Sequence, residues 1–138
     1  MILHQDGLII LLYDPTTDIL SVRWPDINYT SIPILKYSSI KLIDAINHYQ
    51  ITRLLIDSRD TAGEVEDLEY EQFALHISKD LAATALHKIA WVVSEDEARQ
   101  ARTQAYSKDI LAKVVFHQEK QVFCDEEAAI AWLTGQPS

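Results

Sequence analysis

The chain is poor in the residues from which many functional sites are built. Cys124 is the single cysteine in 138 residues, which excludes an internal disulfide and any zinc site made of several cysteines. The three glycines, Gly7, Gly63 and Gly135, stand far apart, so no glycine-rich loop can cradle a phosphate group. No apolar run approaches the roughly 20 residues of a membrane-spanning helix. The sequence therefore lacks the commonest nucleotide-binding, zinc-binding and membrane-spanning patterns.

Basic residues are also scarce. Lys and Arg number 12 against 21 Asp and Glu, which gives a formal charge of −9. Proteins that follow nucleic-acid phosphates or dock on anionic membranes need a basic face, so we expect neither partner. The N-terminus shows no basic segment ahead of a long apolar stretch, so no signal peptide is expected. With a single cysteine, which suits a reducing compartment, this predicts a cytoplasmic protein without membrane insertion.

Hydrophobic residues, by contrast, are abundant. They make up 48% of the chain, enough for a folded core, and the length fits one domain over residues 1–138. The apolar run 8–13 and the segment 19–24, in which Leu20, Val22 and Trp24 alternate with Ser21 and Arg23, flank the turn-forming residues 14–18 and predict a β-hairpin. Because residues 8–13 are apolar without interruption, we expect this strand to be buried on both faces.

Helical spacing and short apolar runs alternate after the hairpin. Strands are expected at 52–57 and 87–93, and at one or both of the runs 114–116 and 122–124. The expected helices are 32–49, 66–84, one after the cap Ser94, and one between the cap Asp125 and Gly135. The fold class is therefore α/β, a mixed sheet with an N-terminal hairpin, covered by about four helices.

Two segments within this order of elements carry a family pattern. The strand Leu54-Leu55-Ile56-Asp57 runs directly into Ser58-Arg59, and residues 122–133 combine a short strand, an acidic cap and an Ala-rich helix ending in Trp-Leu. In these two features, and in the opening hairpin followed by a long helix, the chain resembles the STAS superfamily, and within it the SpoIIAA-like proteins. The resemblance implies a STAS-like domain that is not an enzyme, uses no cofactor and binds a regulatory protein partner.

The resemblance also implies where the partner binds. In STAS antagonists of anti-sigma factors, a Ser after the third strand is phosphorylated to switch binding, which makes Ser58 and Thr61 the candidate hydroxyls here. The candidate partner-binding and switch residues are Asp57, Ser58, Arg59, Asp60, Thr61 and Glu64. The contact surface would be this loop and the start of the second helix.

The loop departs from the antagonist motif, in which a Gly and apolar residues follow the hydroxyls. Seven acidic residues and a single Arg lie between Asp57 and Glu71. A phosphate adds roughly −1.5 to −2 charge, which is unfavourable in a loop that is already negative. We therefore favour constitutive binding to a partner with a basic surface over a phosphorylation switch.

The irregular segment 25–33 offers an alternative site. Trp24, Ile27 and Tyr29 are candidate apolar contacts there, either with a partner or within a pocket for a small molecule or lipid. The second possibility rests on fold analogy, because the SpoIIAA-like fold is similar to a lobe of the lipid-transfer CRAL-TRIO domains. A homodimer that covers an apolar loop or an edge strand also stays open.

Other chemistries fit the residues less well. A divalent cation could bind the acidic residues Asp57, Asp60, Glu64, Glu66 and Asp67. Acidic residues at a helix start are favourable without a cation, however, so we expect no metal. A receiver domain also phosphorylates an Asp at a strand end, but its acidic pair would have to include Asp14, which lies in the hairpin turn. Cys124 follows apolar residues, so we expect it in the core and not in a catalytic dyad with a His. No catalytic residue is predicted.

Overall fold

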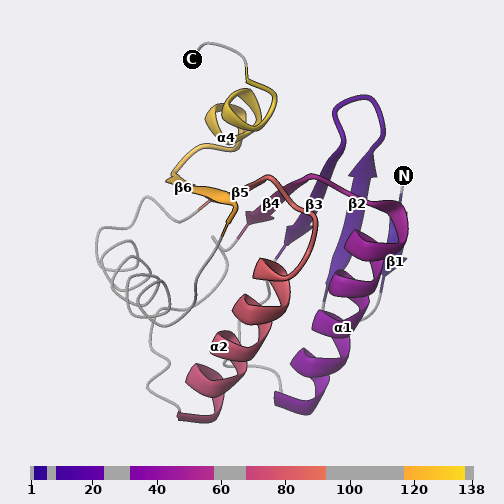
Figure 1. Cartoon of the computed structure of the whole chain (residues 1–138), viewed down its shortest axis with the longest axis vertical. Coiled ribbons are helices and arrows are strands. Elements are labelled where there is room, and N and C mark those ends of the chain that lie inside the picture. Colours follow the sequence, from indigo (N-terminus) through magenta and orange to yellow (C-terminus); the bar gives the residue numbers. More distant parts are fainter. Residues whose placement is uncertain (1, 6–8, 24–31, 58–67, 93–116, 136–138) are drawn as a thin grey trace.

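A computed structural model of the chain describes residues 2–5, 9–23, 32–57, 68–92 and 117–135. These residues form a six-stranded mixed β-sheet with helices on both faces, which confirms the α/β class and the mixed sheet (Figure 1). Within the described ranges the helices number three. The helix expected after Ser94 and the apolar run 114–116 lie outside the described residues.

The elements agree with the sequence pattern to within a few residues at each end. Their order is β1 (Ile2–Gln5), β2 (Ile10–Asp14), β3 (Ile19–Arg23), α1 (Ile32–Tyr49), β4 (Arg53–Asp57), α2 (Leu68–Ala82), β5 (Lys88–Val92), β6 (Glu119–Phe123) and α4 (Glu126–Leu133). The expected hairpin is β2–β3, and α1 has the bounds that its spacing predicts. The strand β1 was not expected.

The strands lie side by side in chain order, from β1 at one edge to β6 at the other. β1, β2 and β3 are antiparallel neighbours, and β3 to β6 are parallel. Parallel neighbours require crossover connections, and α1 and α2 supply the first two. These helices contact each other and run together across one face of the sheet (Figure 1).

The core has two parts, one on each face of the sheet. Alternation along β4 shows the division, because Leu54 packs with the α1 and α2 side and Leu55 with the α4 side. The larger cluster includes Leu42 and Ile46 of α1. On the other face α4 contacts β4, β5 and β6 and inserts the fully buried Leu133. Burial on both faces explains why the central strands are almost continuously apolar.

The expectation that residues 8–13 are buried on both faces was wrong. In β2, Leu11 is fully buried, whereas Ile10 and Leu12 are exposed. Leu11 points to the side of the sheet that α1 and α2 cover. Ile10 and Leu12 point to the opposite face, where the main contacts of α4 are with β4, β5 and β6. An apolar run cannot show how far the covering helix reaches.

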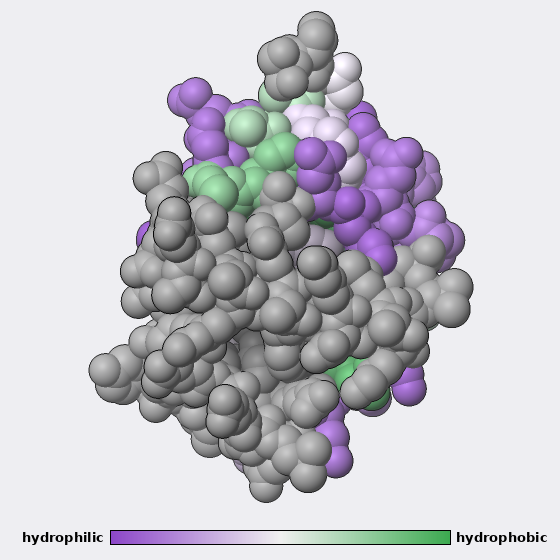
Figure 2. Space-filling view, turned by 90° about the vertical axis from the view of Figure 1, so that its left-hand side faces the viewer, coloured by the Kyte–Doolittle hydropathy of each residue, from purple (hydrophilic) through white to green (hydrophobic). Residues whose placement is uncertain are grey.

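Both ends of α4 form as the sequence predicts. The Asp125 carboxylate accepts a hydrogen bond from the Glu127 amide at 3.0 Å, which caps the first turn. Gly135 adopts a φ of 75°, the left-handed conformation that ends many helices. At this end of the molecule, hydrophobic residues adjoin hydrophilic ones on the surface (Figure 2).

Cys124 is exposed, which corrects the expectation that it belongs to the core. It follows the last residue of β6 and lies in the short connection to α4, where the chain has already left the sheet.

No helix in the described part of the chain combines the length and hydropathy needed to cross a membrane.

Candidate functional site

The carboxyl ends of the parallel strands bring together residues that the sequence does not connect. In the register of the sheet, Arg23 at the end of β3 is the neighbour of Asp57 at the end of β4. Asp57 is in turn the neighbour of Val92 at the end of β5. Adjacent strands lie about 4.8 Å apart, so an exposed guanidinium and a half-buried carboxylate share one face of this edge. Opposite charges on neighbouring strands favour each other.

This edge is also where both candidate segments begin. Residues 24–31 follow Arg23 and residues 58–67 follow Asp57, so the two segments are joined to neighbouring strand ends. Ligands of open α/β sheets bind outside the carboxyl ends of parallel strands. Of the candidate site residues, Asp57 is described. The others lie outside the described residues: Ser58, Arg59, Asp60, Thr61, Glu64, Trp24, Ile27 and Tyr29.

A second polar cluster lies at the opposite ends of the same strands, where β3 and β4 begin. It was not identified from the sequence. The Asp18 carboxylate accepts hydrogen bonds from the Tyr13 hydroxyl at 2.6 Å and from the Thr52 amide at 3.1 Å. The Thr52 hydroxyl also donates to it, at 2.5 Å. Arg53 donates from its guanidinium to the Thr17 carbonyl. The cluster ties the β2–β3 turn to the chain just before β4.

The electrostatics of this cluster favour an ionised Asp18. Burial alone would raise the pKa of Asp18, but hydrogen bonds from Thr52 and Tyr13 and the nearby Arg53 charge lower it, and the net pKa is below the ordinary 3.8. The hydrogen bond to Asp18 and burial raise the pKa of Tyr13 above 10.0. A carboxylate that is ionised and already accepts three hydrogen bonds is suited to holding the turn, not to transferring protons.

Gln118 forms a third polar cluster, at the end of α2. Its side chain is buried, and the amide nitrogen donates to the Leu81 carbonyl at 3.0 Å and lies 3.4 Å from the Thr84 carbonyl. His117 lies against the same Thr84 carbonyl, with Nε2 at 3.1 Å. These contacts satisfy backbone groups where α2 ends, so they attach the start of β6 to that helix.

The described residues do not assemble the alternative sites. They contain no group of three His, Cys, Asp or Glu side chains that could hold a metal ion. Asp14 lies beside the amino ends of the parallel strands, and Asp57 lies at the carboxyl end of β4. The two are at opposite ends of the strands, so the acidic cluster of a receiver domain does not form between them. His117 and Cys124 flank opposite ends of β6, roughly 20 Å apart at the rise of a strand, which argues against a dyad of these two.

The chain matches no protein-family model, no curated protein and no solved structure in the comparisons that were made.

Proposed function

We propose that the chain is a non-enzymatic, cytoplasmic STAS-like module that binds a regulatory protein partner. The contact surface would consist of the segment that follows β4, residues 58–67, and the start of α2. The mixed α/β sheet, in which the β2–β3 hairpin precedes α1, agrees with this proposal at the level of fold class. The specific STAS relationship rests on the sequence resemblance.

The adjacency of Arg23 and Asp57 carries the proposal. The two sites that the sequence offered separately are the segment 25–33 with Trp24, and the loop that begins at Asp57. Both start at the ends of these two neighbouring strands. The first contributes apolar side chains and the second contributes charged ones. Protein interfaces combine an apolar centre with a polar rim, so one partner could contact both segments.

Charge indicates the chemistry of that partner. With seven acidic residues from Asp57 to Glu71, the surface favours a partner with a basic face. Exposed charges separated by more than about 8 Å are largely screened at physiological salt. We therefore expect affinity for the partner to fall as the salt concentration rises. Equal affinity at low and high salt would contradict the basic-partner part of the proposal.

The first experiment is affinity purification of the tagged chain from its native host, followed by mass spectrometry. We expect a specific regulatory protein to copurify, and the same preparation reports any phosphopeptide that spans Ser58 and Thr61. A preparation that contains no specific partner would contradict the proposal. A copurifying small molecule or lipid in its place would support the alternative site near residues 25–33.

A charge reversal then locates the surface. Glu64→Lys should weaken binding of the copurified partner by roughly fivefold, the effect of losing about 1 kcal/mol of charge attraction. Glu119→Lys makes the same change at an exposed position of β6 on the amino edge and should leave affinity unchanged. Equal losses of affinity in the two variants would mean that the partner contacts another surface, or that its affinity depends on the net charge of the chain and not on Glu64.

A further inference from the structure

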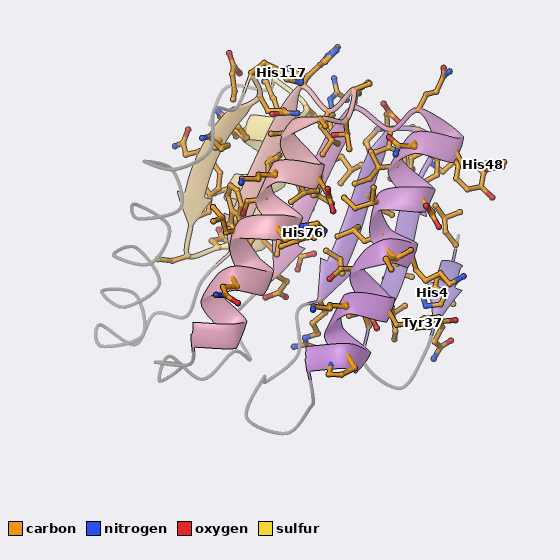
Figure 3. All side chains as sticks on the ribbon, turned by 60° about the horizontal axis from the view of Figure 1, so that its bottom comes forward. His4, Tyr37, His48, His76 and His117 are labelled. Atoms are coloured by element: carbon orange, nitrogen blue, oxygen red, sulfur yellow. The ribbon has the colours of Figure 1, made fainter. Side chains whose placement is uncertain are left out.

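The exposed hydrophobic side chains of the described residues gather on one flank of the molecule. Seven large hydrophobic residues are exposed, and six of them belong to β1, β2 and α1: Ile2, Ile10, Leu12, Tyr37, Ile40 and Tyr49. The seventh, Ile130, belongs to α4. In Figure 3, Tyr37 and His48 of α1 lie toward the same side of the molecule as His4 of β1. These six residues define the β1 flank: Ile2, Ile10 and Leu12 lie on the face of the sheet opposite to α1, and Tyr37, Ile40 and Tyr49 belong to α1 itself.

The β1 flank contains an edge of the sheet. β1 pairs with β2 on one side, and the described residues supply no strand on its other side. Natural edge strands are commonly guarded by charged side chains or proline. At the other edge, β6 carries Glu119 and Lys120, whereas β1 reads Ile-Leu-His-Gln and has neither an acidic residue nor a Lys or Arg.

We infer that the β1 flank is the interface of a two-fold homodimer, in which β1 pairs antiparallel with β1 of a second copy. A two-fold axis perpendicular to the sheet would make one continuous sheet and place α1 of both copies on the same face, antiparallel to each other. On the opposite face, Ile2 of each copy would extend the strip that it forms with its register neighbour Leu12. Such an interface is self-complementary, as a two-fold dimer requires.

The area that a stable interface must bury requires the two α1 helices to contribute to the dimer contact. A stable interface buries about 800 Å² on each partner, which a four-residue strand with a bulge between Ile2 and His4 cannot supply alone. Tyr37 and Ile40 are exposed by 54% and 57% and lie one turn apart on α1. Contact between the two α1 helices would bury these side chains and supply the remaining area.

The charges of the β1 flank are compatible with a second copy of the chain, although the whole chain is acidic. The elements that form this flank, β1, β2 and α1, contain two acidic residues, Asp14 and Asp44, and two lysines, Lys36 and Lys41, so they carry no net charge. On α1 the Lys41 ammonium lies 5.3 Å from the centre of the Tyr37 ring, and Asp44 follows within one turn. We place the two-fold axis between Lys41 and Asp44 of α1, so that Lys41 of each helix lies opposite Asp44 of the other.

The oligomeric state of the full chain tests this inference. Light scattering after size-exclusion chromatography, over about 1–100 μM protein, should give twice the chain mass of 15.7 kDa. Ile40→Lys and Ile2→Lys should each raise the dimer dissociation constant at least tenfold. Ile130→Lys makes the same change at the exposed hydrophobic residue outside the flank, and should not. Circular dichroism checks that each variant is folded. If Ile2→Lys does not fold, Ile40→Lys still tests the interface, because Ile40 is at an exposed position of a helix.

Charge reversal tests the antiparallel arrangement of α1. Lys41→Glu and Asp44→Lys should each weaken the dimer, and the double variant should recover most of the affinity. A monomer throughout the concentration range, or a dimer that Ile130→Lys weakens as much as Ile40→Lys does, would overturn the inference. Because the β1 flank does not include residues 58–67, a monomeric result would leave the proposed partner site standing.

Discussion

Asp18 connects the turn between β2 and β3 to Thr52, which is 34 residues further along the chain. Its backbone φ of 56° is in the left-handed region, where Asp and Asn are tolerated better than most residues. The side chain therefore serves both the local turn and a distant contact. No pattern in the sequence marks the second role, because an Asp in a turn needs no distant partner to be favourable.

Loss of the Asp18 charge should destabilise the fold in a pH-dependent way. Asp18→Asn keeps the tolerance for positive φ but weakens the accepted hydrogen bonds, so we expect a loss of roughly 1–2 kcal/mol at neutral pH. The folded-state pKa of Asp18 is lowered, so its contribution is complete above the unfolded-state pKa of about 3.9 and is lost as pH falls through the folded-state value.

Urea denaturation from pH 7 down to pH 2 checks this prediction. The difference between the wild type and Asp18→Asn should shrink as the pH falls below about 4. Asp14→Asn is the matched control in the same turn, because Asp14 is exposed and accepts one hydrogen bond, from the Thr16 amide at 2.9 Å. A difference that stays constant with pH would show that the Asp18 charge contributes nothing.

At the scale of elements, the cap of α4 is the most direct test of local stability. Asp125→Ala removes the acceptor for the Glu127 amide and should cost about 1 kcal/mol. Asp125→Asn keeps an oxygen in the same place and should cost much less. Chemical denaturation of both variants measures the difference, and similar losses for Ala and Asn would mean that the cap is not what stabilises the start of the helix.

The periodic elements were predictable and the edges of the sheet were not. The spacing of Leu42 and Ile46 identified α1, and the run that ends at Asp57 identified β4 and its polar end. β1 was missed because four residues hold too little alternation to distinguish a strand from a loop. The exposure of Leu12 depends on the reach of α4, which lies more than a hundred residues away in the chain.

The candidate site follows the same division. Asp57 was expected at the end of a strand, and it lies there. Arg23 was not connected with it, because the parallel register of β3 and β4 is set by packing of the sheet against α1 and not by any local signal. Which residues of two such strands become neighbours cannot be predicted from a single sequence, because a helix separates the strands along the chain.

At the scale of the whole molecule, α4 covers β4, β5 and β6 on the second face of the sheet. Leu133 is fully buried against Leu55 and Ala90, so Leu133→Ala should destabilise the protein by about 2–5 kcal/mol. Ile130→Ala, a truncation at the 36% exposed residue of the same helix, should cost less than about 1 kcal/mol. Urea denaturation followed by tryptophan fluorescence provides the comparison.

The result also shows whether the two parts of the core unfold together. If Leu133→Ala lowers the midpoint of a single transition, both faces of the sheet belong to one cooperative unit. If it instead produces a separate early transition, α4 detaches while the larger cluster around Leu54 stays folded. A loss no greater than that of Ile130→Ala would contradict the packing described for Leu133.

The agreement between strand order and chain order affects how the sheet can assemble while the chain is being synthesised. Each of the six described strands from β2 onward pairs with the one synthesised just before it, so none of these six has to be inserted between two that have already paired. The N-terminal hairpin, α1 and β4 can assemble while the later segments are still being translated, since domains begin to fold as they emerge. Each new strand then joins the edge that its predecessor has just completed, and α4, which follows β6, packs against β4, β5 and β6.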